Sequence, residues 1–271
     1  MTNGKSFFTD GEAYERLMGR FTRAAGEVFL DWMSVPTGLS WVDVGCGTGA
    51  FTQLLLDRCA PRHVSAIDPS EEQIAYARTT AVAKSVDFQV GDAQSLPFAN
   101  GQFDAGAMAL VITFVPDPNK AVAELKRVTK PGGVLGTYMW DFFNKGFPQH
   151  LLREALERMG VKVPFQPGHV HSRMANMEGY FRSAGLADVA TRVIEVDVTY
   201  ATFDDYWSAQ TALANYIVQH IRKMPAADVE RLKTDLRTSL PKDKSGGIAY
   251  KARANAVRGV CPDEGHAVLF R

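Results

Sequence analysis

Hydrophobic positions between residues 41 and 140 alternate between short apolar runs and stripes with helical spacing. Short runs bounded by Gly, Pro or Asp are typical of buried strands, and apolar residues three or four apart indicate helices. Strands are predicted at 41–45, 63–68, 86–90, 103–112 and 134–140, and helices at 48–59, 70–83 and 118–128. Because strands and helices alternate, we expect a parallel sheet with right-handed crossovers and helices on both faces.

Capping signals support two of these helices. The run "SEEQ" at 70–73 has the form of a capping box, with Ser70 as the N-cap. In "DPNK", Asp117 is placed as an N-cap and Pro118 at the first helical position, and the glycines of "KPGG" end that helix. The strand at 103–112 is apolar on both faces, as expected of a central parallel strand.

Residues before 41 are predicted to form one or two leading helices, within 1–38. Their apolar positions recur at helical spacing and are interrupted at Gly19. These positions are Tyr14, Leu17, Met18, Phe21, Val28, Phe29, Trp32 and Met33.

After residue 140 the pattern is looser. Helices are predicted at 151–159, at 171–185, and at 206–240 with a break at Pro225. The run 187–200 alternates like a strand, and 248–259 alternates small or apolar with charged residues, which predicts a half-exposed edge strand. We therefore expect a single domain, 1–271, with a core at 39–140 and seven strands in all. The last two strands fall within 186–200 and 248–260, and the segments 141–172 and 201–245 are helical insertions over the C-terminal edge of the sheet.

Composition is consistent with one globular α/β chain. The 271 residues are 46% hydrophobic, and 30 basic residues balance 30 acidic ones, which gives no global field to attract nucleic acid or an acidic membrane. The three cysteines, Cys46, Cys59 and Cys261, lack the spacing of a disulfide framework or a zinc cluster. No run has the length of a membrane span or the form of a signal peptide. We expect a cytoplasmic protein, with the apolar leading helices and 201–245 as candidate faces for a homodimer.

The stretch "WVDVGCGTGAFTQLLL", residues 41–56, carries the most informative chemistry. A strand that turns into a helix through glycines aims backbone N–H groups and the positive helix end at its ligand, and missing Cβ atoms allow close approach. Asp68 and Asp92 end the next two predicted strands, at the same edge of the sheet. Each has a purely structural alternative, Asp68 as a partner for the N-terminus of the following helix and Asp92 as a turn residue after Gly91.

The glycine spacing alone does not identify the ligand. Gly45, Gly47 and Ala50 also satisfy the G-x-G-x-x-G/A pattern of dinucleotide-binding folds. An NAD(P)-dependent oxidoreductase is therefore one alternative, although no Tyr-x-x-x-Lys pair occurs at a useful place.

The whole set of motifs resembles the class I S-adenosylmethionine-dependent methyltransferases. "VDVGCGTG" is similar to the first motif of that family, and "IDPSEEQIAYAR", "VGDAQSLPFANGQFDA" and "FVPDPNKAVAELKRVTKPGGVL" are similar to its later motifs in order and spacing. The resemblance covers 41–140 and is nearest to the methyltransferase type 11 branch, which includes quinone-ring and other small-molecule enzymes. It implies a Rossmann-like, doubly wound, mostly parallel sheet and a small-molecule acceptor.

The same resemblance implies which residues bind S-adenosylmethionine and its product S-adenosylhomocysteine. The glycine loop passes the methionine part, Asp43 faces its amino group, and Asp68 binds the ribose. Pro69 packs on adenine, the Asp92–Ala93 pair meets the adenine amino group, and backbone carbonyls near Leu110 approach the methionine amino group. The full set is Arg20, which is a candidate for the donor's carboxylate, with Asp43, Gly45, Cys46, Gly47, Gly49, Asp68, Pro69, Asp92, Ala93 and Leu110. Cys46 is expected to contribute its backbone, because nothing nearby in sequence would activate its thiol.

Methyl transfer from a sulfonium is an in-line displacement that depends on alignment and exclusion of water. Few catalytic side chains are then needed, and the sequence identifies none. Some relatives have a histidine after strand four, whereas this chain has "VITFVPD", which makes Phe114 a candidate pocket wall. Motifs of the "NPPY" kind, found in relatives that act on nucleobase or glutamine nitrogens, are absent, and the sequence predicts no nucleic-acid partner.

Aromatic residues in and after strand five suggest a lipophilic or aromatic acceptor, because they are expected to be part core and part pocket. They are Tyr138, Trp140, Phe142, Phe143 and Phe147, with Tyr206 and Trp207 further on. His150 and Asp141 lie on the expected acceptor side, while His169 and His171 are weighed as a base or metal ligands against a solvated loop position. The acceptor atom stays open. A third function class is a regulatory protein that binds S-adenosylmethionine or S-adenosylhomocysteine without turnover.

Overall fold

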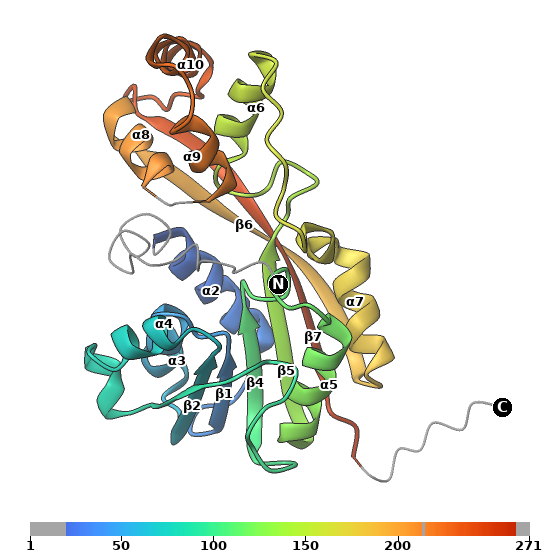
Figure 1. The fold of residues 1–271 in the computed structure, drawn as a ribbon. Coiled ribbons are helices and arrows are strands. Elements are labelled where there is room, and N and C mark those ends of the chain that lie inside the picture. The colour runs from blue at the N-terminus through green and yellow to red at the C-terminus, as the bar shows by residue number, and fades with distance from the viewer. Residues whose placement is uncertain (1–19, 213–214, 264–271) are drawn as a thin grey trace, which may run out of the picture.

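The computed structural model describes residues 20–212 and 215–263, and in these ranges one seven-stranded sheet organises the chain (Figure 1). The strand order is β3-β2-β1-β4-β5-β7-β6. All neighbouring strands pair in parallel except β7, which is antiparallel to both β5 and β6. The strands are β1 Ser40–Val44, β2 His63–Asp68, β3 Asp87–Val90, β4 Phe103–Ala109, β5 Thr129–Trp140, β6 Ala187–Tyr200 and β7 Ile248–Val260. This confirms the predicted Rossmann-like, mostly parallel sheet.

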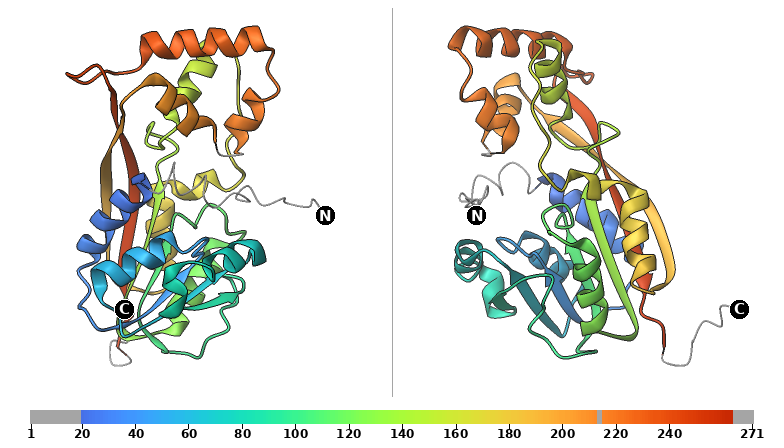
Figure 2. Two further views of the ribbon diagram at one scale, coloured as in Figure 1. Left: turned by 90° about the vertical axis from the view of Figure 1, so that its left-hand side faces the viewer. Right: turned by 45° about the vertical axis from the view of Figure 1, so that its right-hand side comes forward.

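Helices cover both faces of the sheet, as the right-hand view of Figure 2 shows. One core cluster joins α2 and α3 to one face, and a second joins α5 and α7 to the other. The helices are α2 Arg20–Met33, α3 Ala50–Cys59, α4 Glu71–Ala77, α5 Pro118–Val128, α6 His150–Arg158, α7 Met174–Ser183, α8 Phe203–Thr211, α9 Tyr216–Ile221 and α10 Ala226–Ser239. Both layers are thus anchored on strands whose side chains are buried on each side.

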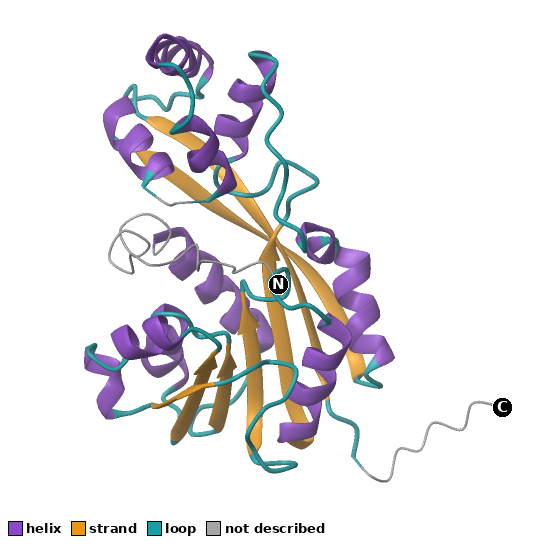
Figure 3. Cartoon of the chain, viewed as in Figure 1, coloured by secondary structure: helices purple, strands orange, loops and turns teal. Residues whose placement is uncertain are grey.

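Strands β5, β6 and β7 have 12, 14 and 13 residues, so they reach beyond the shorter strands β1 to β4. Their far ends carry α6, α8, α9 and α10, which form the upper part of the molecule in Figures 1 and 3. We call this upper part the cap. It lies beyond the carboxyl ends of the parallel strands, where helical insertions were expected.

The prediction that 248–259 is an edge strand is wrong, because β7 lies inside the sheet and β6 forms the edge. The charged residues that suggested exposure have specific partners. The Arg258 guanidinium donates to the carbonyls of Trp32 and Met33 at the end of α2, at 2.6 and 2.9 Å. Lys251 pairs with Asp197 of β6 at 3.4 Å. The small residues between them are buried, so the alternation here reflects an inner strand whose charged residues bond neighbouring segments.

Most predicted helices and strands are confirmed, with shifts at their ends. The helix expected at 70–83 is α4 followed by a 3₁₀ turn at Ala81–Lys84, and that expected at 206–240 is three helices. The helix expected at 171–185 begins at Met174, after a 3₁₀ turn at His169–Ser172. Of the predicted leading helices, the part before Arg20 lies outside the described residues.

The two capping predictions differ in outcome. The Asp117 carboxylate accepts from the backbone N–H groups of Asn119 and Lys120, at 3.1 and 3.3 Å, as expected of an N-cap. Ser70 Oγ accepts from the Gln73 N–H at 3.3 Å, but the Ser70 N–H donates to Asp68 Oδ1 at 2.9 Å. Asp68 therefore takes the place that the capping box assigns to the Gln73 side chain.

Candidate functional site

The turn after β1 is built from glycines in the left-handed region. Gly45, Gly47 and Gly49 have φ values of 77°, 55° and 91°. Residues with a Cβ rarely adopt this conformation, which explains why the turn has glycine at every second position. Gly49 is also the N-cap of α3 and offers no side chain to cap it.

Hydrogen bonds fix this glycine loop, residues 45–49, on the end of β2. The N–H groups of Gly45 and Cys46 both donate to the Ile67 carbonyl, at 2.7 and 3.1 Å. The Gly47 N–H donates to Asp68 Oδ2 at 3.0 Å. The two strand ends therefore form one rigid rim.

The Asp43 carboxyl lies beneath this rim and is fully buried. Oδ2 accepts from the Thr52 hydroxyl at 2.6 Å, while Oδ1 has no partner among the residues that the structure describes. Burial raises the pKa of Asp43 to about 7; the Thr52 bond opposes this shift and the nearby Asp68 charge adds to it. An unpaired buried carboxylate oxygen is costly, so this atom is suited to a cationic partner.

Asp68 ends β2 with 8% of its surface exposed. Burial raises the pKa of its carboxyl, and the N–H groups of Ser70 and Gly47 act in the opposite direction. Asp68 also has the structural role considered above, because it accepts from the Ser70 N–H at the start of α4. The contact with Gly47 brings it to the glycine loop as well, as a ribose-binding acid would require.

A strained turn follows β4. Leu110 has a φ of 61°, which is unfavourable for a bulky side chain, and its N–H donates to the Tyr138 carbonyl at 2.8 Å. This turn places Val111 over the glycine loop, because a Cβ built on Gly45 would lie 2.3 Å from Val111 Cγ2. The strand predicted at 103–112 consequently ends at Ala109.

Asp92 lies at the same edge of the sheet. The Gly91 N–H donates to the Asp68 carbonyl at 3.1 Å, which links the end of β3 to Asp68. Asp92 is exposed, and its Oδ1 accepts from the Gln94 N–H at 2.8 Å, so its turn role is also present. Ala93 is buried and Pro69 is exposed.

The structure thus brings ten of the eleven predicted residues to one edge, in the segments 43–49, 68–69, 92–93 and 110. Arg20 begins α2, and its side chain is not among those described. Cys46 is buried, and burial together with the nearby carboxylates raises the pKa of its thiol. This supports a backbone role for Cys46, because the reactive thiolate is disfavoured.

A cavity of about 410 Å³ adjoins the glycine loop. It lies between α2, α3 and the end of α4, and it includes Thr22, whose buried hydroxyl has no partner among the described residues. Its lining is Thr22, Arg23, Thr48, Gly49, Ala50, Phe51, Gln53, Leu54, Tyr76, Thr80 and Val82.

The aromatic residues in and after β5 separate into core and cap. Tyr138 is fully buried, with its ring 4.8 Å from that of Phe29, so it belongs to the core. Phe142 and Phe147 pack on each other at 5.3 Å. Trp140 ends β5 with 5% exposure, and its indole N–H has no partner among the described residues.

The candidate histidines and Asp141 make structural contacts. His169 stacks on Phe143 at 5.4 Å, and His171 Nδ1 lies 2.6 Å from the Tyr180 hydroxyl. Burial lowers the pKa of both His150 and His171, which favours their neutral forms. The Asp141 carboxylate accepts from the Phe143 and Asn144 N–H groups. Within the described residues, no group of three or more His, Cys, Asp or Glu is placed to hold a metal ion.

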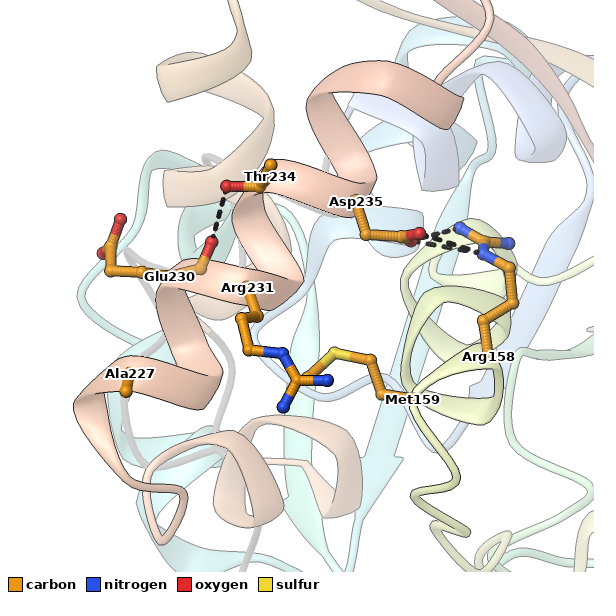
Figure 4. A pocket seen from close by; sticks show the side chains of 7 residues that line it. All are labelled: Arg158, Met159, Ala227, Glu230, Arg231, Thr234 and Asp235. Carbon is orange, nitrogen blue, oxygen red and sulfur yellow. Dashed lines mark hydrogen bonds and ion pairs between the residues drawn. The ribbon is translucent and has the colours of Figure 1, made fainter.

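A second cavity, of about 540 Å³, lies in the cap between α6 and α10 (Figure 4). Its wall is charged, with Arg158 paired to Asp235 at 2.5 Å. The lining residues are Arg158, Met159, Ala227, Glu230, Arg231, Thr234 and Asp235, none of which belongs to the glycine loop.

Three residues that shape the glycine loop were not predicted from the sequence. Thr52 bonds Asp43, Val111 covers Gly45, and a Cβ built on Gly47 would lie 2.8 Å from Gln73 Oε1. A hydroxyl in the first turn of the helix after the loop was a usable signal for Thr52. No such signal marked Val111 or Gln73. Val111 already fitted the apolar pattern of the predicted strand, and Gln73 already fitted the capping box.

Comparisons with known proteins agree with this geometry. Residues 42–137 match a family model described as a methyltransferase domain. The chain is 37% identical over 122 residues to a malonyl-[acyl-carrier protein] O-methyltransferase of Pectobacterium atrosepticum, covering 45% of this chain and 46% of the relative. It is 34% identical over 113 residues to a ubiquinone/menaquinone biosynthesis C-methyltransferase of Roseobacter denitrificans, covering 40% and 45%.

Similarity in fold extends further than similarity in sequence. The crystal structure of the YcgJ protein of Bacillus subtilis superposes with a TM-score of 0.58 and 19% identity, covering 88% of this chain and 98% of that one. At this identity the likeness concerns the fold. The chain spans a little under half the length of the two curated relatives. Within the described residues, no helix has the length and apolar character needed to cross a membrane.

Proposed function

We propose that the protein, whose residues 42–137 match a methyltransferase domain model, is a class I S-adenosylmethionine-dependent methyltransferase that transfers a methyl group to a small lipophilic or aromatic molecule. The observation that carries this proposal is the rim formed by the glycine loop and Asp68, with the unpaired Asp43 oxygen beneath it. We propose the eleven residues from Arg20 to Leu110 named above as the donor site, in one domain divided as the sequence predicts.

The residues present fit this donor. Its amino-acid tail carries an ammonium group, for which the buried and unpaired Asp43 Oδ1 is a suitable acceptor. Its ribose offers hydroxyl donors, which suit the Asp68 carboxylate at the end of β2. When bound, S-adenosylmethionine supplies an electrophilic methyl group on a positively charged sulfur.

The chain's own contribution is placement and exclusion of water. Hydrogen bonds from the glycine loop to β2 and the strained turn at Leu110 hold the rim in one geometry, so little ordering is needed on binding. Val111 covers the loop, and the aromatic residues of the cap provide an apolar boundary on the acceptor side. Since His150 and His171 favour their neutral forms, no charged histidine is required in this scheme.

The names of the relatives support a small-molecule acceptor. One relative is named for a malonyl group on a carrier protein and another for ubiquinone and menaquinone biosynthesis. The proposal includes a cytoplasmic location and a homodimer through α2 or the helices within 201–245. It includes no nucleic-acid partner.

Two measurements test the proposal. Purified protein is incubated with S-adenosylmethionine and quinol, phenol and carboxylate acceptors, and we expect S-adenosylhomocysteine to form with at least one class. Calorimetry with S-adenosylhomocysteine then compares wild type with Asp68→Ala, for which we expect affinity to fall by about 1.5–3 kcal/mol, the loss of a charged hydrogen bond. Asp87→Ala, an exposed residue at the opposite end of β3, is the control and should bind normally.

The outcomes separate the alternatives. Saturable donor binding without product across all acceptors would favour the regulatory function over the enzyme. Stabilisation by NADH, but not by S-adenosylmethionine, would replace the methyltransferase with an oxidoreductase. Unchanged affinity in Asp68→Ala would remove Asp68 from the donor site.

A further inference from the structure

Helix α8 places two buried polar side chains one turn apart on the same face. Tyr206 and Gln210 are 0% and 3% exposed. The start of α8 is fixed by a complete capping box between Thr202 and Asp205. The face that the two side chains share is directed at the paired ends of β6 and β7, where Tyr200 and Tyr250 lie.

The orientation of the Gln210 amide follows from its contacts. Its Nε2 donates to the hydroxyl oxygens of Tyr200 and Tyr250, at 2.8 and 3.2 Å. The Tyr250 hydroxyl donates its own hydrogen to the Pro148 carbonyl at 2.7 Å, so it can only accept from the amide. Gln210 Oε1 is consequently turned away from both tyrosines, and it has no partner among the described residues.

The Tyr206 hydroxyl is a donor without an acceptor. Its ring contacts those of Tyr200 and Tyr250 edge-on, with centroids 5.3 and 6.5 Å apart, yet the oxygen has no hydrogen-bond partner in the part of the chain described. Burial raises the pKa of Tyr206 far above its ordinary value, so the group stays a neutral phenol. Among the described residues, an unused donor and an unused acceptor thus lie one helical turn apart on the buried face of α8. Such groups are rarely left unsatisfied in proteins.

An aromatic contact links this pair to the donor side. Phe21 of α2 meets Tyr200 edge-on at 6.0 Å. The next residue, Thr22, lines the cavity that also includes Thr48 and Gly49 of the glycine loop. A ligand that extends from the loop along these rings would therefore reach α8.

We infer that Tyr206 and Gln210 form a polar subsite for a hydroxyl group of the methyl acceptor. A hydroxyl accepts from the Tyr206 O–H and donates to Gln210 Oε1, which satisfies both groups at once. The ligand class is a lipophilic alcohol or phenol whose hydroxyl lies apart from the methylated atom. This inference rests on the proposed methyltransferase function. Because both atoms are buried, entry requires α8 to move away from the ends of β6 and β7.

The test uses pairs of probes on one, two and three fused aromatic rings, each as the hydroxy and the methoxy compound. Binding is measured by calorimetry and thermal shift on full-length protein saturated with S-adenosylhomocysteine. Wild type is expected to bind the hydroxy member of at least one pair about ten times more tightly, because the methoxy group cannot donate to Gln210. Gln210→Met removes the acceptor that only the hydroxy compound can use, and it should lose most of that preference. Tyr206→Phe keeps the ring but removes a donor that both compounds can use, and it should weaken the binding of both by a similar factor.

Tyr180→Phe is the matched control, since it removes a hydroxyl that bonds His171 on α7, and it should keep the preference. Without ligand, Tyr206→Phe should melt at the same temperature as wild type or higher, because it removes an unsatisfied group. A lower melting temperature of Tyr206→Phe with no change in probe affinity would identify a bridging water and overturn the subsite. The absence of a hydroxy preference in wild type would also overturn it. Failure of S-adenosylhomocysteine to bind at all would instead overturn the proposed function.

Discussion

The glycine loop differs from the polar cluster under α8 in where its buried polar groups find hydrogen-bond partners. That cluster consists of Tyr200, Tyr206, Gln210 and Tyr250. Around the loop, the partners of each group come from a short stretch of chain, and Asp43, Thr52 and Asp68 lie within 26 residues. Under α8, the partners come from residues 148, 200 and 250. Each region retains buried polar atoms that have no partner within residues 20–212 and 215–263. The loop is thus a local structure suited to a constant ligand, whereas the cluster depends on how the cap is assembled.

The largest effect is expected from Gly45→Ala. Alanine at a φ of 77° costs about 1–2 kcal/mol, and its Cβ would lie 2.3 Å from Val111 Cγ2, which adds an overpacking cost of about 1–3 kcal/mol. We expect the free energy of unfolding in urea to fall by about 2–4 kcal/mol and affinity for S-adenosylhomocysteine to fall at least tenfold.

Gly38→Ala provides a control for the backbone term. Gly38 has a φ of 76°, and a Cβ there would meet nothing within 4 Å. The free energy of unfolding of this variant should fall only by the backbone cost of about 1–2 kcal/mol. Its affinity for S-adenosylhomocysteine should not change. Equal effects of the two variants would show that the contact with Val111 does not shape the loop.

The next effect concerns Asp43 and pH. Its pKa in the folded protein is about 7, against an ordinary value of 3.8, so the folded state binds a proton that the unfolded chain releases between these values. The contribution of the Asp43 proton to the free energy of unfolding is fully present below pH 4. It decreases by about 1.4 kcal/mol per pH unit as the pH rises to about 7. Relative to Asp43→Asn, which keeps the shape and stays neutral, wild type should lose about 2–3 kcal/mol between pH 5 and 7.

Urea unfolding of both proteins at pH 5, 6, 7 and 8 measures this difference. Above pH 7 it should be constant, because the folded and unfolded states then both hold the carboxylate. Parallel pH profiles for wild type and Asp43→Asn would show that Asp43 is ionised in the folded protein throughout this range.

The same contrast explains what the sequence could predict. The strands, α3, the Asp117 cap and the glycine loop follow from short-range patterns, because φ > 0, capping and strand burial act within a few residues. The position of β7 inside the sheet does not follow from such patterns. Arg258 of β7 donates to the Met33 carbonyl at the end of α2, which is 225 residues away in the sequence. The convergence of the glycine loop, Asp43 and Asp68 at one edge of the sheet was also predicted, and the structure shows it. Val111, Gln73 and the cluster under α8 were not, because their roles arise only when distant segments pack.

The smallest effect is expected from Tyr250→Phe in the cap. This change removes the donor to the Pro148 carbonyl and one acceptor of the Gln210 amide, while the ring remains. We expect stability to fall by about 1 kcal/mol, the net value of a typical hydrogen bond. Affinity for S-adenosylhomocysteine should not change, because Tyr250 belongs to the cap and the donor rim is held by its own local bonds. Calorimetry and urea unfolding on one preparation test both statements. A loss of donor affinity would mean that the two regions are coupled and would remove the contrast between a local donor site and an assembled cap.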